Sequence, residues 1–380
     1  MQLFRIDPLT KKRLQRFRRI KRGYYSFLIL VILFVLSLFS EFIANDRALA
    51  VKYDGKLYFP TLKFYPMSTF DQKDEYGFDD VEANYLGLKT ELRELRAEFK
   101  QRMESYSGTE AELIAAEPKY ARKDAWVLMP MVPFDPYEPD FTYDVPPPNA
   151  PDGRHWFGTD GQGRDVFARL LYGFRISMVF ALLLVVLGQT VGTIIGSLQG
   201  YIAGRFDLYG QRFIEIWGTL PFLYVVIIIS AFFIINMWKL IIIFAIFQWI
   251  RITYYMRTEM YREKTREYCL AARSYGASSW RIMFRHLLPN CLTPLVTFTP
   301  FFIVGAIGSL TALDYLGFGL PAPTPSWGEL IDQALQSDNR DKIWLSIAPF
   351  GAISITLVLV TFVGESVREA FDPKQFARYK

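Results

Sequence analysis

The sequence has few of the side chains from which metal centres and disulfide frameworks are built. Its 380 residues include two cysteines, Cys269 and Cys291, and two histidines, His155 and His286. Two thiols in one short segment cannot form a disulfide framework or a cysteine-rich metal site elsewhere in the chain. The composition therefore argues against a small disulfide-stabilised protein and offers no clustered ligands for a metal.

The sequence also lacks the GxxxxGK[ST] loop that binds nucleotide phosphates. In that loop, backbone N–H groups surround the phosphates and a lysine reaches them, so this chain is not expected to hydrolyse ATP itself. No cofactor is expected in the chain. The formal net charge of +5 does not indicate a nucleic-acid partner either, because the basic residues cluster beside apolar runs, where membrane topology explains them.

Apolar residues are abundant and are concentrated in long runs. Hydrophobic residues make up 51% of the chain, and they gather in runs of about 20 residues, the length that crosses about 30 Å of hydrocarbon. This pattern predicts an all-α polytopic membrane protein with six transmembrane helices. The expected spans are residues 24–44, 176–198, 213–237, 238–256, 291–313 and 343–363.

The distribution of charge predicts which side of the membrane each end occupies. Residues 1–23 are strongly basic and contain one acid, Asp7, next to the first apolar run. Such a segment is expected to stay in the cytoplasm. Counting six passes from this end also puts the loop 257–290 and the tail 365–380 in the cytoplasm.

The long polar segment 45–155 is predicted to form a small α+β domain outside the cytoplasm. Its residues 51–59 alternate around Asp54-Gly55, which is a strong signal for a β-hairpin. Residues 81–103 carry apolar side chains at helical spacing and predict one long helix. Residues 130–151 are rich in proline and aromatic residues, so we expect an extended strap. Nothing in this domain indicates catalysis.

The polar segment 267–290 lies between two strongly apolar segments and has the pattern of a helical hairpin. Gly276 is expected to end a first helix, because glycine takes the left-handed conformation without steric cost. Ser278 or Ser279 can then cap a second helix, which is expected to stop near Pro289. The pattern predicts a docking element for another protein; an ordinary amphipathic hairpin at a membrane surface is the alternative.

This segment resembles the EAA loop of ABC-importer permeases, which in that family is the cytoplasmic coupling helix that contacts the ATPase subunit. The match falls on Ala271, Ala272, Gly276, Leu288 and Pro289. Leu270 stands where the motif has glutamate, and His286 stands where it usually has isoleucine. By this resemblance the residues that contact the ATPase would be Glu267, Ala271, Ala272, Gly276, Ala277, His286, Leu288 and Pro289.

Residues 155–173 resemble the GTDxxGRDxxSRLLYGxRIS segment of the dipeptide and oligopeptide branch of these permeases, with Ala168 in place of the usual serine. The matching motif residues are Gly158, Thr159, Asp160, Gly163, Arg164 and Asp165. From the residues alone, the segment predicts a capped amphipathic helix at the outer interface, with its charges in a polar environment. A hydrolytic site made of Asp160, Asp165 and His155 is a second, weaker hypothesis.

Two further segments resemble the same branch, residues 316–329 and 364–373. With its long insert, the chain is most similar to the Yej-type permeases of microcin C and oligopeptide importers. The resemblance implies the type I ABC importer permease fold, in the bacterial inner membrane, with a second permease subunit, a twin or paired ABC ATPase that binds ATP and magnesium, and a periplasmic substrate-binding protein. The implied cargo is oligopeptides, with microcin C-like peptides as one candidate.

Four glycines recur at every fourth residue of the second span, at Gly188, Gly192, Gly196 and Gly200. Small residues at this spacing let helices pack closely in lipid, and the partner helix can belong to this chain or to another subunit. Two other functional classes are weighed against the importer. A secondary transporter would need ionisable residues or a repeat in the spans, and a membrane-anchored protein would act through its periplasmic domain.

Overall fold

The computed structural model describes residues 8–74 and 77–371 of the chain. Residues 1–7 of the predicted N-terminal segment and residues 372–380 of the predicted tail therefore lie outside the described residues.

The chain divides into two compact units. The helical unit contains the residues up to Val35 and those from Gly173 onwards, and the insert unit is Leu36–Tyr172. The insert unit is thus wider at both ends than the segment 45–155 that composition predicts, because the last turns of one apolar helix and the first turns of the next pack with it.

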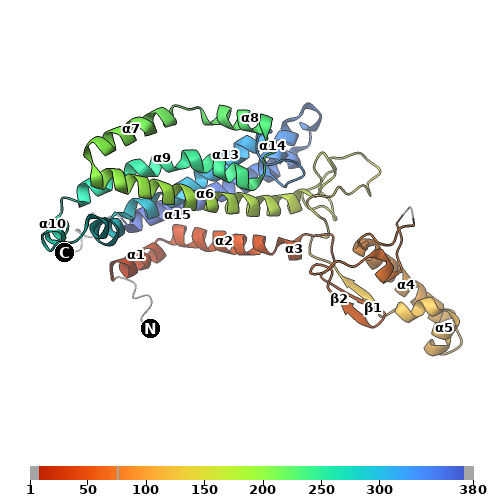
Figure 1. Ribbon diagram of the computed structural model, residues 1–380. Coiled ribbons are helices and arrows are strands. Elements are labelled where there is room, and N and C mark those ends of the chain that lie inside the picture. Colours follow the sequence, from red (N-terminus) through yellow and green to blue (C-terminus); the bar gives the residue numbers. More distant parts are fainter. Residues whose placement is uncertain (1–7, 75–76, 372–380) are drawn as a thin grey trace. The chain divides into compact units, whose positions relative to one another are not determined.

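The helical unit is built from long helices, of which α6, α9, α13 and α15 run side by side (Figure 1). The helices that contribute to it are α1 (Pro8–Arg19), α2 (Lys21–Leu38), α6 (Val166–Ile202), α7 (Gly204–Gly218), α8 (Phe222–Phe232), α9 (Met237–Glu263), α10 (Glu267–Ser274), α11 (Ser279–Arg281), the π-helix η3 (Ile282–Leu287), α12 (Leu288–Cys291), α13 (Thr293–Tyr315), α14 (Trp327–Leu335), the 3₁₀-helix η4 (Ser337–Asn339) and α15 (Ile343–Phe371).

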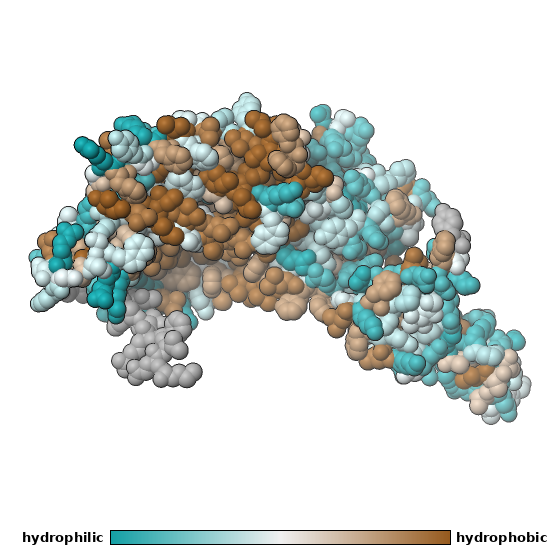
Figure 2. Space-filling view, viewed as in Figure 1, coloured by the Kyte–Doolittle hydropathy of each residue, from teal (hydrophilic) through white to brown (hydrophobic). Residues whose placement is uncertain are grey.

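Among the described residues, five helices are long and apolar enough to cross a membrane: α2, α6, α9, α13 and α15. The pair α7 and α8 would make a sixth, although it is bent by 67°. Apolar side chains cover the visible surface of these helices (Figure 2), as expected for a protein whose solvent there is lipid. The predicted all-α membrane fold with a small insert is confirmed.

The third predicted span, 213–237, is wrong as a single helix. Helix α7 begins nine residues earlier, at Gly204, and ends at Gly218, and α8 starts only after Pro221. Proline has no N–H to donate and disfavours helical geometry in the residue before it, so the helix breaks there. Three other spans, α6, α9 and α15, are longer than predicted, because these helices continue past their apolar runs into polar flanks.

The glycine stripe of α6 packs against α9 of the same chain. A Cβ added at Gly192 would lie 1.9 Å from Cγ2 of Ile252, and one at Gly196 would lie 2.5 Å from the carbonyl oxygen of Thr253. At Gly188 and Gly200 the nearest atoms also belong to α9. At Gly192, Gly196 and Gly200 only glycine allows this distance between the two backbones, so these three residues set how closely α6 and α9 approach.

An ion pair ties α7 to α9. The carboxylate of Asp207 accepts hydrogen bonds from Nε and Nη2 of Arg257 at 2.5 and 2.6 Å and from the hydroxyl of Tyr261 at 2.5 Å. Asp207 is buried, and a bidentate arginine matches a carboxylate well. One end of the broken third span is therefore held firmly to the bundle.

The insert unit contains a three-stranded antiparallel sheet in the order β2-β1-β3. The strands are β1 (Ala50–Tyr53), β2 (Lys56–Tyr58) and β3 (Trp126–Leu128). The predicted hairpin is confirmed: Asp54 and Gly55 have φ of 47° and 75°, and Val51 pairs with Tyr58. Positive φ at both turn residues suits the twist of a two-residue hairpin.

Helix α4 (Tyr85–Ser105) covers one face of this sheet, close to the predicted range 81–103. Leu88 and Leu92 of α4 pack with Val51, Tyr53 and Phe70 in the core of the insert unit. The remaining helices of the unit are α3 (Ser40–Ile43), η1 (Met67–Phe70), α5 (Glu110–Ala116) and η2 (Pro118–Arg122). The chain from 129 to 165 contains only isolated β-bridges, as predicted for a strap.

Candidate functional site

The segment from α10 to α12 forms a tight, internally bonded turn. Helix α10 ends in a Schellman motif: the N–H of Ala277 donates to the carbonyl of Ala272 at 3.1 Å, and the N–H of Gly276 donates to that of Arg273 at 3.0 Å. Gly276 has φ of +75°, which an L-residue adopts only with strain. The predicted break at Gly276 is confirmed, and it gives the turn a defined shape.

Ser278 caps the second helix, and its Oγ accepts a hydrogen bond from the N–H of Arg281 at 3.4 Å. The helical segment ends at Cys291, two residues after Pro289 and so near the predicted stop, but Pro289 itself lies inside it. The chain passes from α11 through the π-helix η3 into α12, which contains Pro289 near its start and runs to Cys291. The proline ring would clash with a carbonyl of the preceding turn in a regular α-helix, and the wider π-helical turn relieves that clash. No sequence pattern predicts such a turn.

One face of this segment is buried in the helical unit. Cys269, Met283 and Cys291 pack with Met260 of α9 and Phe302 of α13 in one apolar cluster. Burial, and then the charges of two nearby glutamates, raise the pKa of the Cys291 thiol to about 12. The thiol is therefore protonated and unreactive at neutral pH, and it serves as an apolar packing group.

The other face carries large exposed side chains. Tyr275 is 91% exposed, Trp280 is 66% exposed and Leu270 is 51% exposed. The ring centroids of Trp280 and Phe284 lie 4.3 Å apart. Trp280, Tyr275 and Leu270 are all exposed on this turn, and we call these three residues the apolar patch. A rigid turn with a buried face and an exposed apolar face can dock another protein without rearranging.

The start of α10 is anchored to the end of α9. Glu263 is buried and accepts hydrogen bonds from Tyr268 at 3.0 Å, and it forms an ion pair with Arg266 at 2.9 Å. Burial, and then this hydrogen bond, raise the pKa of Tyr268 to about 12. These two contacts hold the start of α10 to the end of α9.

The residues predicted from the EAA resemblance divide between the two faces. Ala272 and Ala277 face the buried cluster, and Leu288 packs beside it. Ala271, Gly276 and the remaining motif residues are exposed or half-buried: Glu267, His286 and Pro289. The motif missed Tyr275 and Trp280, although aromatic residues in a polar loop between two apolar spans are a signal that could have indicated them.

The motif 158–165 forms a buried ionic network in the insert unit, which corrects the prediction of a polar, interfacial environment. Asp160, Arg164 and Arg169 are all at most 1% exposed. Oδ2 of Asp160 accepts a hydrogen bond from Nε of Arg164 at 2.8 Å and lies 3.4 Å from Nε of Arg169. Arg169 also donates to the carbonyl of Pro136 at 2.9 Å. These bonds fasten the strap to the start of α6.

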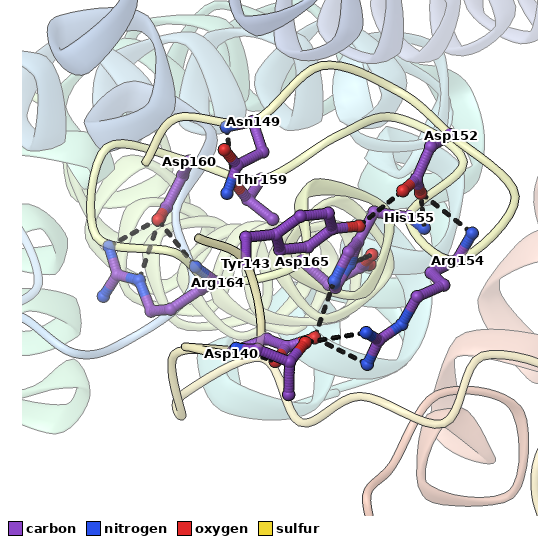
Figure 3. Close-up of polar contacts among 11 residues, drawn as sticks. Asp140, Tyr143, Asn149, Asp152, Arg154, His155, Thr159, Asp160, Arg164 and Asp165 are labelled. Carbon is purple, nitrogen blue, oxygen red and sulfur yellow. Dashed lines mark hydrogen bonds and ion pairs between the residues drawn. The ribbon is translucent and has the colours of Figure 1, made fainter. Parts of the chain in front are cut away.

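Asp165 begins α6 and holds His155. Its Oδ1 accepts a hydrogen bond from the N–H of Ala168 at 2.7 Å, which is the predicted cap. Its Oδ2 lies 2.7 Å from Nδ1 of His155, whose Nε2 lies 3.1 Å from Oδ2 of Asp140 (Figure 3). Burial opposes the charge on His155, but the bonds to Asp165 and Asp140 outweigh it and raise the pKa of the imidazole.

The remaining motif residues set the backbone conformation of the loop that leads into α6. Gly158 and Gly163 have φ of 71° and 84°, and Thr159 binds the backbone of Asn149 through both its N–H and its hydroxyl. Asp160 pairs with arginines and not with His155, so the structure does not bring together the three residues of the hydrolytic hypothesis.

Comparison with known proteins identifies the family. The family described as "binding-protein-dependent transport system inner membrane component" matches residues 191–376. The inner membrane ABC transporter permease protein YejE of Escherichia coli K12 is 39% identical over 371 residues, covering 98% of this chain and 99% of that protein. The chain belongs to the ABC transporter permease family.

Two other relatives differ in the cargo that their names state. The peptidoglycan transport system permease protein YejE of Agrobacterium fabrum is 39% identical over 384 residues, covering 98% of this chain and 95% of that permease. The oligopeptide transport system permease protein OppC of Lactococcus lactis subsp. lactis is 36% identical over 229 residues, covering 59% of this chain and 77% of its own length.

Family membership decides between the functional classes. This permease is a membrane subunit of a transporter and not an enzyme, since its relatives are permeases whose ATPase is a separate subunit. The secondary transporter and the membrane-anchored protein that acts through its insert are therefore wrong. Membership also implies an ATPase and a substrate-binding protein as partners.

Proposed function

We propose that this permease is the membrane-spanning subunit of an ATP-driven importer that carries peptides from the periplasm into the cytoplasm. The observation that carries the proposal is the apolar patch on a rigid turn whose other face is buried against α9 and α13. Together with the family, it supports a role for residues 267–291 as the contact with a separate ATPase, which binds ATP and magnesium.

The proposed mechanism is rigid-body gating. When the ATPase subunits close on ATP, they move the turn that they hold, and the turn moves α9 because Glu263 and the buried cluster join the two. ATP binding then favours one of two conformations through contacts that differ between them. A second permease subunit would complete the pathway as a heterodimer.

We propose the topology that charge predicts: both termini and the turn in the cytoplasm, and the insert unit in the periplasm of the bacterial inner membrane. The basic helix α1 beside the apolar α2 supports this orientation. A periplasmic binding protein would deliver the cargo. The name of the OppC relative states oligopeptides and that of the Agrobacterium relative states peptidoglycan. Oligopeptides, microcin C-like peptides and peptidoglycan fragments are therefore the candidates to compare.

The test is a substitution in the apolar patch. Tyr275→Glu places a charge on a side chain that is 91% exposed, so folding and membrane insertion should persist. We expect the variant to lose the co-purifying ATPase in mild detergent and to lose ATP-driven uptake of an oligopeptide, because the charge would be buried at the contact without a partner.

A matched control is Phe141→Glu, which charges an aromatic residue of the insert unit that is 77% exposed. This control should keep both the ATPase and uptake. Normal peptide uptake by Tyr275→Glu would show that the turn is not the ATPase contact. If no ATPase co-purified with the unaltered chain, the importer proposal would be rejected.

A further inference from the structure

Helix α9 carries a charged side chain near its middle. Arg251 lies about 20 Å from either end of the helix at 1.5 Å per residue, and the helix is long and apolar enough to cross a membrane. Its side chain is exposed, and within the described part of the chain it forms no ion pair. A charge that faces lipid at this depth is costly, so such residues normally face protein or a water-filled path.

The guanidinium of Arg251 lies against the neighbouring helix α13. Its Cζ is 5.9 Å from the ring centroid of Phe302, within the range of a cation–π contact. Phe302 is buried and lies about 14 Å along α13 from the first residue of that helix, Thr293. Arginine side chains near helix ends often extend towards the membrane surface, but here the charge is held beside a buried ring well inside the span.

Polar side chains of α6, α9 and α13 lie close to this position. The amide of Gln189 in α6 donates to the hydroxyl of Thr299 in α13 at 2.9 Å, and this hydroxyl lies 3.2 Å from the amide oxygen. Gln189, Gln248 of α9 and Phe302 line one small cavity. Polar groups at membrane depth are stable where protein or water satisfies them. The surroundings of Arg251 are therefore a polar zone between three apolar helices.

Two exposed tyrosines adjoin the charge. Tyr254 and Tyr255 follow Arg251 by three and four residues, so all three share one face of α9. Both tyrosines are exposed, and the ring of Tyr255 stacks on that of Phe298 in α13 with centroids 4.3 Å apart. Aromatic rings with a polar end contact apolar and polar groups alike. The face therefore joins one positive charge to an aromatic surface that tolerates many side chains.

We propose that Arg251 binds the C-terminal carboxylate of the peptide cargo, while Tyr254 and Tyr255 contact the last side chains of that peptide. Every linear peptide with a free C-terminus carries this carboxylate whatever its sequence, and a guanidinium matches a carboxylate with two parallel hydrogen bonds. One arginine would therefore hold peptides of different composition at the same point. The proposal rests on the proposed function and names the part of the cargo that the pathway recognises.

The place of Arg251 in α9 links this contact to the proposed gating. Helix α9 continues from Arg251 to Glu263, which bonds to Tyr268 and Arg266 at the start of the turn. A movement of the turn would therefore reach Arg251 along one continuous helix. A carboxylate contact that is made in one conformation and broken in the other would hold the cargo and then release it.

The test is ATP-driven uptake by the complete transporter in liposomes, with the second permease, the ATPase and the binding protein. The probes are the tripeptide Ala-Ala-Ala and its C-terminal amide, which lacks the negative charge. The measured quantity is the ratio of kcat/KM for the acid to that for the amide. Because the binding protein is the same in every assay, a change in this ratio between variants reports the contact made by the permease.

Three variants locate the contact. Arg251→Gln should lower the ratio about tenfold or more, because uptake of the acid loses a charge-assisted pair that the amide never makes. Arg251→Lys keeps the charge but not the paired donors, so it should recover part of the ratio. The matched control Lys239→Gln removes an exposed positive charge about 18 Å away along the same helix and should leave the ratio unchanged.

An unchanged ratio in Arg251→Gln, or an equal loss of uptake for the acid and the amide, would overturn the proposal. Failure of Arg251→Gln to co-purify with the second permease would also overturn it, in favour of a contact between subunits. The proposed function fails in a different way. If the unaltered transporter showed no ATP-driven uptake of either tripeptide, the importer itself would be rejected, whereas uptake with an unchanged ratio rejects the role of Arg251 alone.

Discussion

Replacing Gly192 by alanine tests the closest approach of α6 and α9. A Cβ there would lie 1.9 Å from Cγ2 of Ile252 and 2.4 Å from the carbonyl oxygen of Trp249, whereas carbon contacts are normally about 3.5 to 4.0 Å. The side chain of Ile252 can rotate away, but the carbonyl belongs to the backbone. The helices must therefore separate by about 1 to 2 Å.

The energetic result is the balance of opposing effects. Alanine is favoured over glycine in a helix by about 1 kcal/mol, which stabilises the variant. Overpacking costs about 1 to 3 kcal/mol, and separation also lengthens the 3.2 Å hydrogen bond from the hydroxyl of Thr253 to the carbonyl of Gly192, worth about 0.6 kcal/mol in a membrane. Since the whole stripe loosens together, we expect a net loss of about 1 to 3 kcal/mol.

The assay is unfolding of the purified chain by SDS in mixed micelles, followed by circular dichroism. The matched control is Gly188→Ala, where the nearest atom is the side-chain Cβ of Gln248 at 3.1 Å, so a small shift suffices. We expect that control to stay within about 1 kcal/mol of the unaltered chain. If Gly192→Ala proved as stable as Gly188→Ala, the close packing of α6 on α9 would be refuted.

Three further predictions concern other elements. Asp160→Asn should destabilise the insert unit by about 3 to 5 kcal/mol in denaturant unfolding, because it leaves the buried charge of Arg164 without its partner; a loss under 1 kcal/mol would contradict the buried network. The raised pKa of His155 means that its contribution to stability is complete below about pH 6.5 and is lost as pH rises through the folded-state pKa. The unfolding temperature of the unaltered chain should therefore fall relative to that of His155→Gln over this pH range. Parallel curves of unfolding temperature against pH for the two proteins would refute this. Gly276→Ala should cost about 1 to 2 kcal/mol from the left-handed backbone alone, because nothing lies within 4 Å of the added Cβ, and a stabilised variant in the same SDS assay would contradict the strained turn.

Much of the helical unit could be predicted because its signals are local in sequence. An apolar run of about 20 residues is a property of consecutive side chains, and the bilayer requires backbone hydrogen bonds to close within each such run. The hairpin at Asp54-Gly55 and the break at Gly276 are local for the same reason, since each depends on the backbone conformations open to one or two residues.

The candidate site was predicted only in part. The turn at Gly276 and the cap at Ser278 follow from the sequence, but the π-helix and the continuation through Pro289 do not, because they depend on how the segment packs on Met260 and its neighbours. Exposure of Tyr275 likewise depends on which face α9 and α13 cover.

The sequence by itself determined that this protein is a helical membrane permease with a polar insert, and it contains no GxxxxGK[ST] loop. Tertiary structure decided where the charges lie: Asp160 and its arginines are buried together, and His155 lies between Asp140 and Asp165. The physical reason is distance along the chain. Hydropathy, turns and caps are set by neighbouring residues, whereas burial, ion pairing and helix contact are set by segments that meet only after folding.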